Sequence, residues 1–349
     1  MCQALKNSKL KSLRILKQNA SQNQNFGLEN SNKLATFGKH IEKLEIIDDR
    51  INLDPEDVNE ISKIKTLKSV KISYFTEKSL VNFAKNCHKL ETLSIGRIID
   101  LIDSFESLAQ AFDTFFEERR YSLKKFSTLH FYESKFCFRN IHVCQNLEEL
   151  VIKVRFLNIL DCESISQLKG LKKLMIMQAY SIDDSNLRSI IENIDVAYLK
   201  SLILVGYGDT NGKLFETISK KHFPALERLY IKSSGYSDQA VQELVRNCPN
   251  LKSAQLYVLH DYLNYQNSWS KSISIHTLID NSIKNKLYID FGALYIYYGP
   301  SAIDFASLNT KLSKYSLDLW MKYQDLKRNF EEWCNDNMWS YKNESGWES

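Results

Sequence analysis

The chain contains little glycine or proline and has no long apolar run. Its 349 residues include only 11 glycines and 4 prolines, which leaves little room for flexible linkers, and no low-complexity tract divides the chain. No apolar stretch approaches membrane-spanning length, and the first residues lack the apolar core of a secretory signal. These absences argue against a membrane protein and against a string of loosely linked domains.

An excess of charge of one sign is also missing. The formal net charge is only +4, which is too small to indicate nucleic-acid binding by itself. Hydrophobic residues make up 44% of the chain and charged residues 25%, enough to bury a large core beneath a soluble surface. We therefore expect a globular protein without a nucleic-acid partner.

Catalytic motifs are absent as well. The sequence has no serine nucleophile elbow, no H-E-x-x-H pair and no phosphate-binding loop. Gly206, Gly208 and Gly212 follow a strand-like run, but their spacing is G-x-G-x-x-x-G rather than the G-x-G-x-x-G of dinucleotide sites. We expect no enzyme activity and no cofactor, with a nucleotide pocket near Gly206 as the weakest alternative.

The cysteines indicate a repeat rather than a disulfide framework or a metal site. Their number, seven, is odd, and Cys87, Cys144 and Cys248 each stand three residues before a leucine that opens a strand-like run. Cys137 and Cys144 have two histidines nearby but lack the C-x-x-C spacing of a zinc site. We therefore expect no metal, buried thiols and a reducing location, which is cytoplasmic and/or nuclear.

One apolar frame, Leu-x-x-Leu-x-Leu or a close variant, recurs along residues 10–256. Its first positions are Leu10, Ile41, Leu67, Leu90, Leu123, Leu147, Leu171, Leu199, Leu226 and Leu251. Successive steps of 23 to 33 residues are close to the period of leucine-rich repeats. The second and third apolar positions lie two residues apart, as in a strand with one buried face.

A segment with helical spacing follows several of these strand-like runs. Residues 237–248 place Val241, Leu244, Val245 and Cys248 on one helical face, and residues 76–87 and 182–191 repeat the arrangement. A strand, a turn and a helix in each unit predict an α/β leucine-rich-repeat solenoid. The expected shape is a horseshoe with parallel strands on the concave face and helices on the convex face.

Two departures from the frame define the expected domain organisation. The 33-residue step after Leu90 contains an apolar helical run, which should lengthen the outer helix. Further along, one or two additional strands are expected from Ile273, Ile275, Leu287, Ile289, Leu294 and Ile296. We expect a leucine-rich-repeat domain of about ten repeats over residues 1–300 and a helical, aromatic-rich cap or tail over residues 301–349. Four of the five tryptophans lie in the tail, which covers the last repeat or, alternatively, binds a partner.

The strand residues that point away from the core change character along the chain. They are mostly polar or small in the first four repeats and become apolar or aromatic from the sixth repeat onward. Because adjacent strands lie ~4.8 Å apart, the later residues should form one contiguous stripe edged by Lys153 and Lys173. The predicted partner-binding residues are Val151, Met175, Met177, Ile203, Val205, Arg228, Tyr230, Lys232 and Tyr257. The alternative is that the tail packs against this stripe and hides it.

The repeats resemble the cysteine-containing leucine-rich repeats of F-box/leucine-rich-repeat proteins, a ribonuclease-inhibitor-like group. The sequences Asn-Cys-His-Lys-Leu90 and Asn-Cys-Pro-Asn-Leu251 carry the resemblance, which covers roughly residues 10–256. It implies that the solenoid captures a protein substrate while an N-terminal F-box docks the Skp adaptor and cullin of an SCF-type E3 ubiquitin ligase. No F-box is recognisable ahead of Leu10, so Skp and cullin are expected as partners only of a longer form that carries one.

These observations predict a protein-binding module without catalytic residues. The resemblance implies substrate recognition in ubiquitin-dependent protein degradation. A ligase-independent scaffold or inhibitor that binds a protein partner is the alternative.

Overall fold

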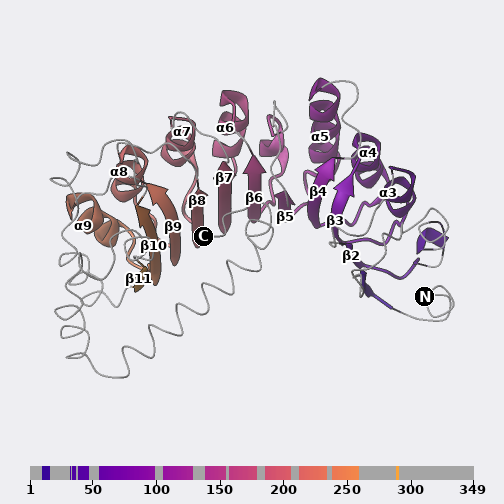
Figure 1. The fold of residues 1–349 in the computed structure, drawn as a ribbon, viewed down its shortest axis with the longest axis horizontal. Helices are drawn as coiled ribbons and strands as arrows, with labels where there is room; N and C mark the ends of the chain where they lie inside the picture. Colours follow the sequence, from indigo (N-terminus) through magenta and orange to yellow (C-terminus); the bar gives the residue numbers. More distant parts are fainter. Residues whose placement is uncertain are drawn as a thin grey trace, which may run out of the picture. The chain divides into compact units, whose positions relative to one another are not determined.

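The structure is a computed structural model that describes residues 10–15, 32, 34–36, 38–46, 55–98, 105–128, 138–154, 157–178, 185–205, 212–233, 238–258 and 288–290. The chain divides into two compact units, Met1–Leu199 and Lys200–Ser349. Each unit is a parallel sheet whose strands follow chain order, with helices along one side (Figure 1). The domain boundary expected near residue 300 lies outside the described residues and stays a prediction.

The described residues of unit 1 form seven strands in chain order, each parallel to the next. Its elements are β1 (Ser12–Ile15), β2 (Lys43–Ile46), α3 (Pro55–Ile61), β3 (Ser69–Phe75), α4 (Glu77–Asn86), β4 (Thr92–Ile98), α5 (Phe105–Arg119), β5 (Lys125–Thr128), the 3-10 helix η1 (Ile141–Val143), β6 (Glu149–Val154), α6 (Ile159–Ser166), β7 (Lys173–Gln178) and α7 (Ser185–Asn193).

In the part of unit 2 that the structure describes, four parallel strands repeat the arrangement. Its elements are β8 (Ser201–Val205), α8 (Lys213–Lys220), β9 (Arg228–Ser233), α9 (Asp238–Asn247), β10 (Ser253–Val258) and β11 (Tyr288–Asp290). Of the one or two further strands expected between Ile273 and Ile296, the structure describes β11, which contains Ile289; the other positions lie outside the described residues. Gly206 and Gly208, from the glycine-rich run, lie outside the described residues.

All ten copies of the apolar frame carry a strand that begins two residues after the first position. The second position of each frame pairs with that of the next in register, from Leu44 with Val70 to Leu150 with Leu174. We call these second-position residues the inward row; from β2 to β7 their exposed fraction is at most 1%. The chain is therefore an α/β leucine-rich-repeat solenoid, as the sequence predicts.

The long step after Leu90 lengthens the outer helix, as expected. It produces α5, whose 15 residues make it the longest helix in the described ranges. Phe112, Phe115 and Phe116 on this helix pack against Phe126 of β5, with ring centroids 5.4 to 6.5 Å from Phe126. Phe138 joins the cluster 6.2 Å from Phe126. Rings at these separations fill the core where the following repeat has only the short η1.

The helices begin at residues suited to their caps. Thr76 caps α4 by accepting a hydrogen bond from the backbone N–H of Ser79, and the Ser79 side chain accepts one from the backbone N–H of Thr76. Gly212 precedes α8 with a φ of 72°, a left-handed conformation that glycine adopts without strain. A helix-capping role explains this glycine without a bound nucleotide.

The Asn-Cys motif ties the two repeats that carry it, at residues 86–87 and 247–248, to the repeat before. Cys87 donates its thiol hydrogen to the carbonyl of Ile64 at 3.3 Å, and the amide of the adjacent Asn86 reaches the carbonyl of Ser62 at 3.5 Å. In unit 2 the amide of Asn247 donates to the carbonyl of Ser219 at 2.7 Å. The motif therefore satisfies carbonyls at the end of the preceding helix, which would otherwise lack partners.

The residue after each first position adds a row of ion pairs along the strand edge. In unit 1, Glu42 lies between Lys11 and Lys68 at 3.4 and 2.8 Å, and the pair Lys124 with Glu91 is 3.0 Å apart. The hydrogen bond from Lys68 is the main cause of a lowered pKa at Glu42. Because these pairs are exposed, they favour the observed register more than they stabilise the fold.

Candidate functional site

The strand residues that point away from the helices form a second row beside the inward row. In unit 1 the outward row, one residue per strand, pairs in register as Arg14, Glu45, Lys71, Ser94, Ser127, Val151 and Met175. Successive side chains of a strand alternate between the two faces, so this row contributes nothing to the core beneath the helices. It is the surface on which the sequence places the partner site.

The outward row of β1–β5 is polar and accessible. Arg14 is exposed, and Glu45, Lys71, Ser94 and Ser127 are half-buried. Glu45 accepts ion pairs from Arg14 at 3.4 Å and from Lys43 at 2.9 Å. Ser127 donates a hydrogen bond to the hydroxyl of Ser94 at 2.6 Å. The part of the outward row on these five strands is therefore a set of neighbouring charges and hydroxyls in contact with water.

The outward row of β6 and β7 is apolar and buried, whereas the sequence left open whether these side chains form an exposed stripe or a hidden one. Val151 lies beside Met175, and Lys153 beside Met177, as the sequence predicts. However, Met175 and Met177 are 0% exposed, Val151 is 8% exposed and Lys153 is 3% exposed. Apolar side chains side by side on a sheet gain free energy when covered, so β6 and β7 are buried on both faces. Their partner-binding role stays a prediction.

The predicted residues of unit 2 show the same trend. Ile203 pairs with Tyr230, and their exposed fractions are 0% and 9%. Arg228 is exposed at the start of β9. Lys232 pairs with Tyr257 on the neighbouring strands, while the side chains of Val205, Lys232 and Tyr257 lie outside the described part. Among the predicted residues of unit 2 whose side chains are described, Ile203 and Tyr230 are buried neighbours and Arg228 is exposed.

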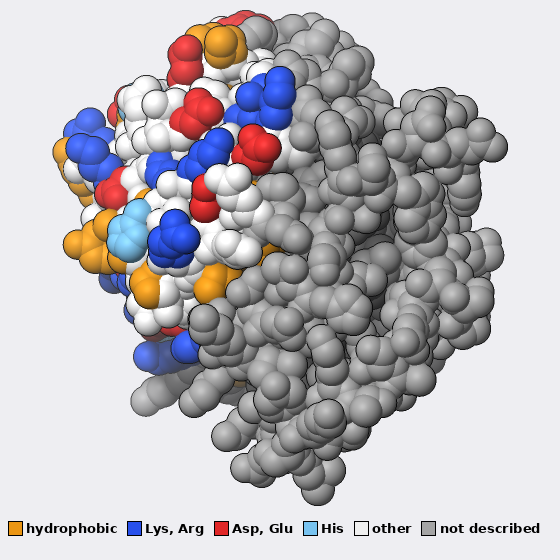
Figure 2. All heavy atoms as spheres, turned by 90° about the vertical axis from the view of Figure 1, so that its left-hand side faces the viewer, with side chains coloured by type: hydrophobic (Ala, Val, Ile, Leu, Met, Phe, Trp, Pro, Cys, Tyr) orange, Lys and Arg blue, Asp and Glu red, His pale blue; other side chains and the backbone are white. Residues whose placement is uncertain are grey.

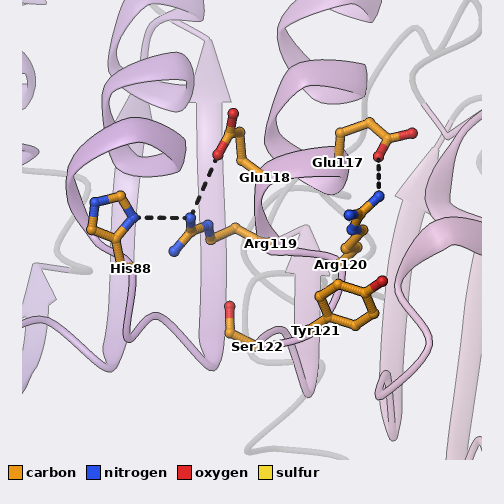
Figure 3. Close-up of a pocket in the computed structure, with 7 residues that line it drawn as sticks. All are labelled: His88, Glu117, Glu118, Arg119, Arg120, Tyr121 and Ser122. Carbon is orange, nitrogen blue, oxygen red and sulfur yellow. Dashed lines mark hydrogen bonds and ion pairs between the residues drawn. The ribbon is translucent and has the colours of Figure 1, made fainter.

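A polar hollow of about 470 Å³ at the end of α5 has no counterpart in the sequence interpretation. Arg119, 4% exposed, donates to the carbonyl of Cys87 at 2.8 Å and lies 3.3 Å from Nδ1 of His88 (Figure 3). The Arg119 guanidinium also lies 3.8 Å from Glu118. It therefore caps the end of α4 from the next repeat.

The remaining charges of the hollow are also paired. Arg120 lies 3.7 Å from Glu117, and its guanidinium stacks over the ring of Tyr121 at 4.7 Å. Since both arginines have a carboxylate partner, the hollow carries no excess charge to attract an ionic ligand. Nε of Arg119 and Oγ of Ser122 are buried and have no hydrogen-bond partner in the protein. Buried polar atoms of this kind are commonly satisfied by water.

The cysteines of the repeat are buried, as predicted. Cys87, Cys144 and Cys248 are at most 2% exposed, and Cys162, which the repeat argument did not select, is 2% exposed. Burial raises the pKa of each of these thiols to about 12. Thiols with so high a pKa are poor nucleophiles and poor metal ligands.

Within the described residues, no three His, Cys, Asp or Glu side chains come together as a candidate metal site. Of the helices in the described ranges, none combines the length and apolar character needed to cross a membrane. On the side of unit 2 that carries α8 and α9, the described surface mixes both signs of charge (Figure 2).

No protein-family model matches the chain, and no curated protein matches it. Among solved structures, a chain of the yeast Rad7 and Elc1 complex is 14% identical, with a TM-score of 0.36 over 78% of this chain and 83% of that chain. An internalin, InlF, of Listeria monocytogenes is 15% identical, with a TM-score of 0.41 over 73% and 77%. A leucine-rich-repeat protein of Leptospira interrogans is 12% identical, with a TM-score of 0.30 over 74% and 86%. At these scores the likenesses carry no argument about function, and the fold assignment rests on the repeats themselves.

Proposed function

We propose that this chain is a protein-binding module whose partner contacts the outward row of the strands. The observation that carries the proposal is the contrast between the two rows of unit 1. The inward row is apolar and buried from β2 to β7, whereas the outward row changes from charged to apolar within the same register. Stacking of the repeats does not fix the chemistry of the outward row, which leaves it available for recognition.

The accessible part of this row lies on β1–β5 and suits a polar protein surface. It presents Arg14 and Lys71 on either side of Glu45, followed by the hydroxyls of Ser94 and Ser127. Charges of both signs in a fixed order favour one orientation of a complementary partner.

Charge reversal on the strands tests the proposal. Co-purified partners are quantified by mass spectrometry for the wild type, for Lys71→Glu and for Lys78→Glu, an exposed lysine of α4 on the helix side. We expect Lys71→Glu to reduce capture of the specific partner at least tenfold and Lys78→Glu to change it less than twofold. Equal effects of the two variants would show that the partner uses another surface.

The finer role that we propose is substrate selection for an SCF-type ubiquitin ligase. The helix-ending Asn-Cys sequences before Leu90 and Leu251 support it, because they are the feature shared with F-box/leucine-rich-repeat proteins. The partners would then be a protein substrate, together with Skp and cullin when an F-box is present. A purified complex scored for Skp and cullin subunits tests this role. Capture of a protein partner without either subunit favours the ligase-independent scaffold or inhibitor.

A cytoplasmic or nuclear location belongs to the same proposal. Cys87, Cys144, Cys162 and Cys248 are free thiols in the described part of the chain, which supports a reducing compartment. Fractionation of cells that express the tagged chain tests the location.

A further inference from the structure

Cations outnumber carboxylates on the outward face of β1–β3. Arg14 and Lys71 lie on either side of Glu45 in the sheet register, and Lys43 lies two residues before Glu45 on β2. The Glu45 carboxylate lies 2.9 Å from the ammonium group of Lys43 and 3.4 Å from the guanidinium group of Arg14. Among the described outward residues of these three strands, one carboxylate therefore stands against three cations.

The strand edge of the same repeats shows that the fold does not require this excess. There Glu42 lies between Lys11 and Lys68, at 3.4 and 2.8 Å. Glu91 continues the alternation in the next repeat, where it pairs with Lys124 at 3.0 Å. Alternation of this kind gives each cation a carboxylate on a neighbouring repeat. The outward face of β1–β3 lacks it among the described residues, so its charge is available to a partner.

The spacing of the cations indicates what such a partner carries. Because neighbouring strands are ~4.8 Å apart, about 10 Å separates the backbones of Arg14 on β1 and Lys71 on β3. In an extended peptide, side chains two residues apart point to the same side at a separation of about 7 Å. Long Arg and Lys side chains bridge this difference. Two acidic residues with one residue between them therefore match the cations on either side of Glu45.

We propose that the outward face of β1–β3 binds an extended acidic segment of the partner protein, in which two Asp or Glu residues are separated by one residue. One carboxylate pairs with Arg14 and the other with Lys71. The inference rests on the proposed function and names the chemistry of the partner at one end of the outward row. Glu45 is itself a carboxylate held by these cations, so it competes with the segment and limits its affinity.

Synthetic peptides of equal charge test the spacing with the full chain. Fluorescence polarisation at low ionic strength compares two labelled peptides, Ala-Ala-Glu-Ala-Glu-Ala-Ala and Ala-Ala-Glu-Glu-Ala-Ala-Ala. We expect the first to bind at least threefold more tightly, because adjacent side chains of an extended peptide point to opposite sides. Equal affinities, or no binding of either peptide, overturn the proposal.

A third peptide separates carboxylates from phosphate. It carries one phosphoserine in place of the two glutamates and has a similar charge. We expect it to bind more weakly than the peptide with alternating glutamates. Tighter binding would show that the face selects a phosphorylated segment, which contradicts the proposal.

Three variants of the chain locate the site. Arg14→Ala should weaken binding of the alternating peptide at least fivefold, and Glu45→Gln should strengthen it at least threefold because the cations lose their internal competitor. Lys124→Ala removes an exposed lysine of the strand edge and should change the affinity less than twofold. Resistance of the buried Cys87 to thiol reagents shows that each variant is folded.

The variants also define how the proposal fails. Equal losses in Arg14→Ala and Lys124→Ala would mean that only the overall charge attracts the peptide, and an unchanged affinity in Glu45→Gln would place the peptide elsewhere. Partner capture by Lys71→Glu measures the proposed function separately, because the peptides need no natural partner. If the peptides fail while Lys71→Glu still reduces capture, the outward row binds a partner without an acidic segment.

Discussion

The polar strands β1–β5 and the apolar strands β6 and β7 of unit 1 share one backbone plan and differ on one face. Both regions have an apolar inward row in continuous register. Both also have the same type of ion pair at the strand edge, Lys124 with Glu91 and Lys172 with Glu148. Only the outward row differs, because it is accessible on β1–β5 and buried on β6 and β7. The inward row therefore stabilises the stacking of the repeats, whereas the outward row determines what else can pack against the sheet.

The largest effect should come from the inward row, which the two regions share. Phe126 is 1% exposed and lies within 6.5 Å, centroid to centroid, of four other phenylalanines. We expect Phe126→Ala to reduce the free energy of unfolding by about 3–5 kcal/mol, because it leaves a cavity in a packed aromatic cluster. Urea titration measures it. Ser127→Ala, the adjacent outward residue, should cost less than about 1 kcal/mol. Equal costs would contradict the division into two rows.

The next largest effect on stability should separate the two regions within the outward row, at Met175 of β7 and Ser94 of β4. Met175→Ala on β7 should reduce the free energy of unfolding by about 2–4 kcal/mol, since the side chain is fully buried. Ser94→Ala, in the same row on β4, should cost less than about 1 kcal/mol because Ser94 is half-buried. Chemical denaturation compares the two variants. A small cost at both positions would mean that the apolar face is not held under a stable cover.

A pH effect should appear on the helix side of the apolar region. Asp161 of α6 is 0% exposed, and burial raises its pKa from 3.8 to about 7. Hydrogen bonds from the backbone N–H of Phe138 and from Asn158 limit the increase. The folded state binds this proton more tightly than the unfolded state, so the contribution to stability is full below pH 3.8 and is lost as pH rises to about 7.

Asp161→Asn should remove this pH dependence while retaining an acceptor for the Phe138 N–H. We expect the variant to be more stable than the wild type at pH 8 by about 1–3 kcal/mol, and to lose that advantage below pH 4. Urea titration at several pH values measures the difference, and Glu163→Gln, an exposed change on the same helix, is the control. A difference that does not vary with pH would show that Asp161 has the same pKa in the folded and unfolded states.

The smallest effect concerns the Asn-Cys motif, which occurs in both units. Asn247 donates to the preceding repeat at 2.7 Å, whereas Asn86 makes the equivalent bond at 3.5 Å. Asn247→Ala should cost about 1 kcal/mol and Asn86→Ala less, because the longer bond is weaker. Thermal unfolding followed by circular dichroism compares them. The reverse order would mean that the motif acts through something other than these bonds.

The repeat was predictable because its signal is local and occurs ten times. The frame that opens at Leu90, Leu147 and Leu251 places strands where the structure has them, and the helical spacing after Ser237 gives α9. The extra length after Leu90 indicates α5. The buried cysteines at 87, 144 and 248 were also predictable, although their bonds to the preceding repeat were not. Those bonds join residues about 25 positions apart, and no pattern within one repeat reveals them.

The candidate site was predictable only in part. Alternation along a strand shows that Val151 and Met175 lie on the same face and side by side, and the register confirms it. Alternation does not show whether that face meets water. The hollow at Arg119 was missed for a similar reason, because it forms where the end of α5 meets His88 of the repeat before.

The sequence by itself determined the repeat period, the inward row and the order of the strands, because each depends on which side chains a short segment must bury. Only the tertiary structure decided that Met175 and Met177 are covered, that Asp161 titrates near neutral pH and that Arg119 caps α4. Exposure and pKa depend on atoms contributed by segments far apart in the chain. Local periodicity carries no information about those atoms, whereas the fold brings them together.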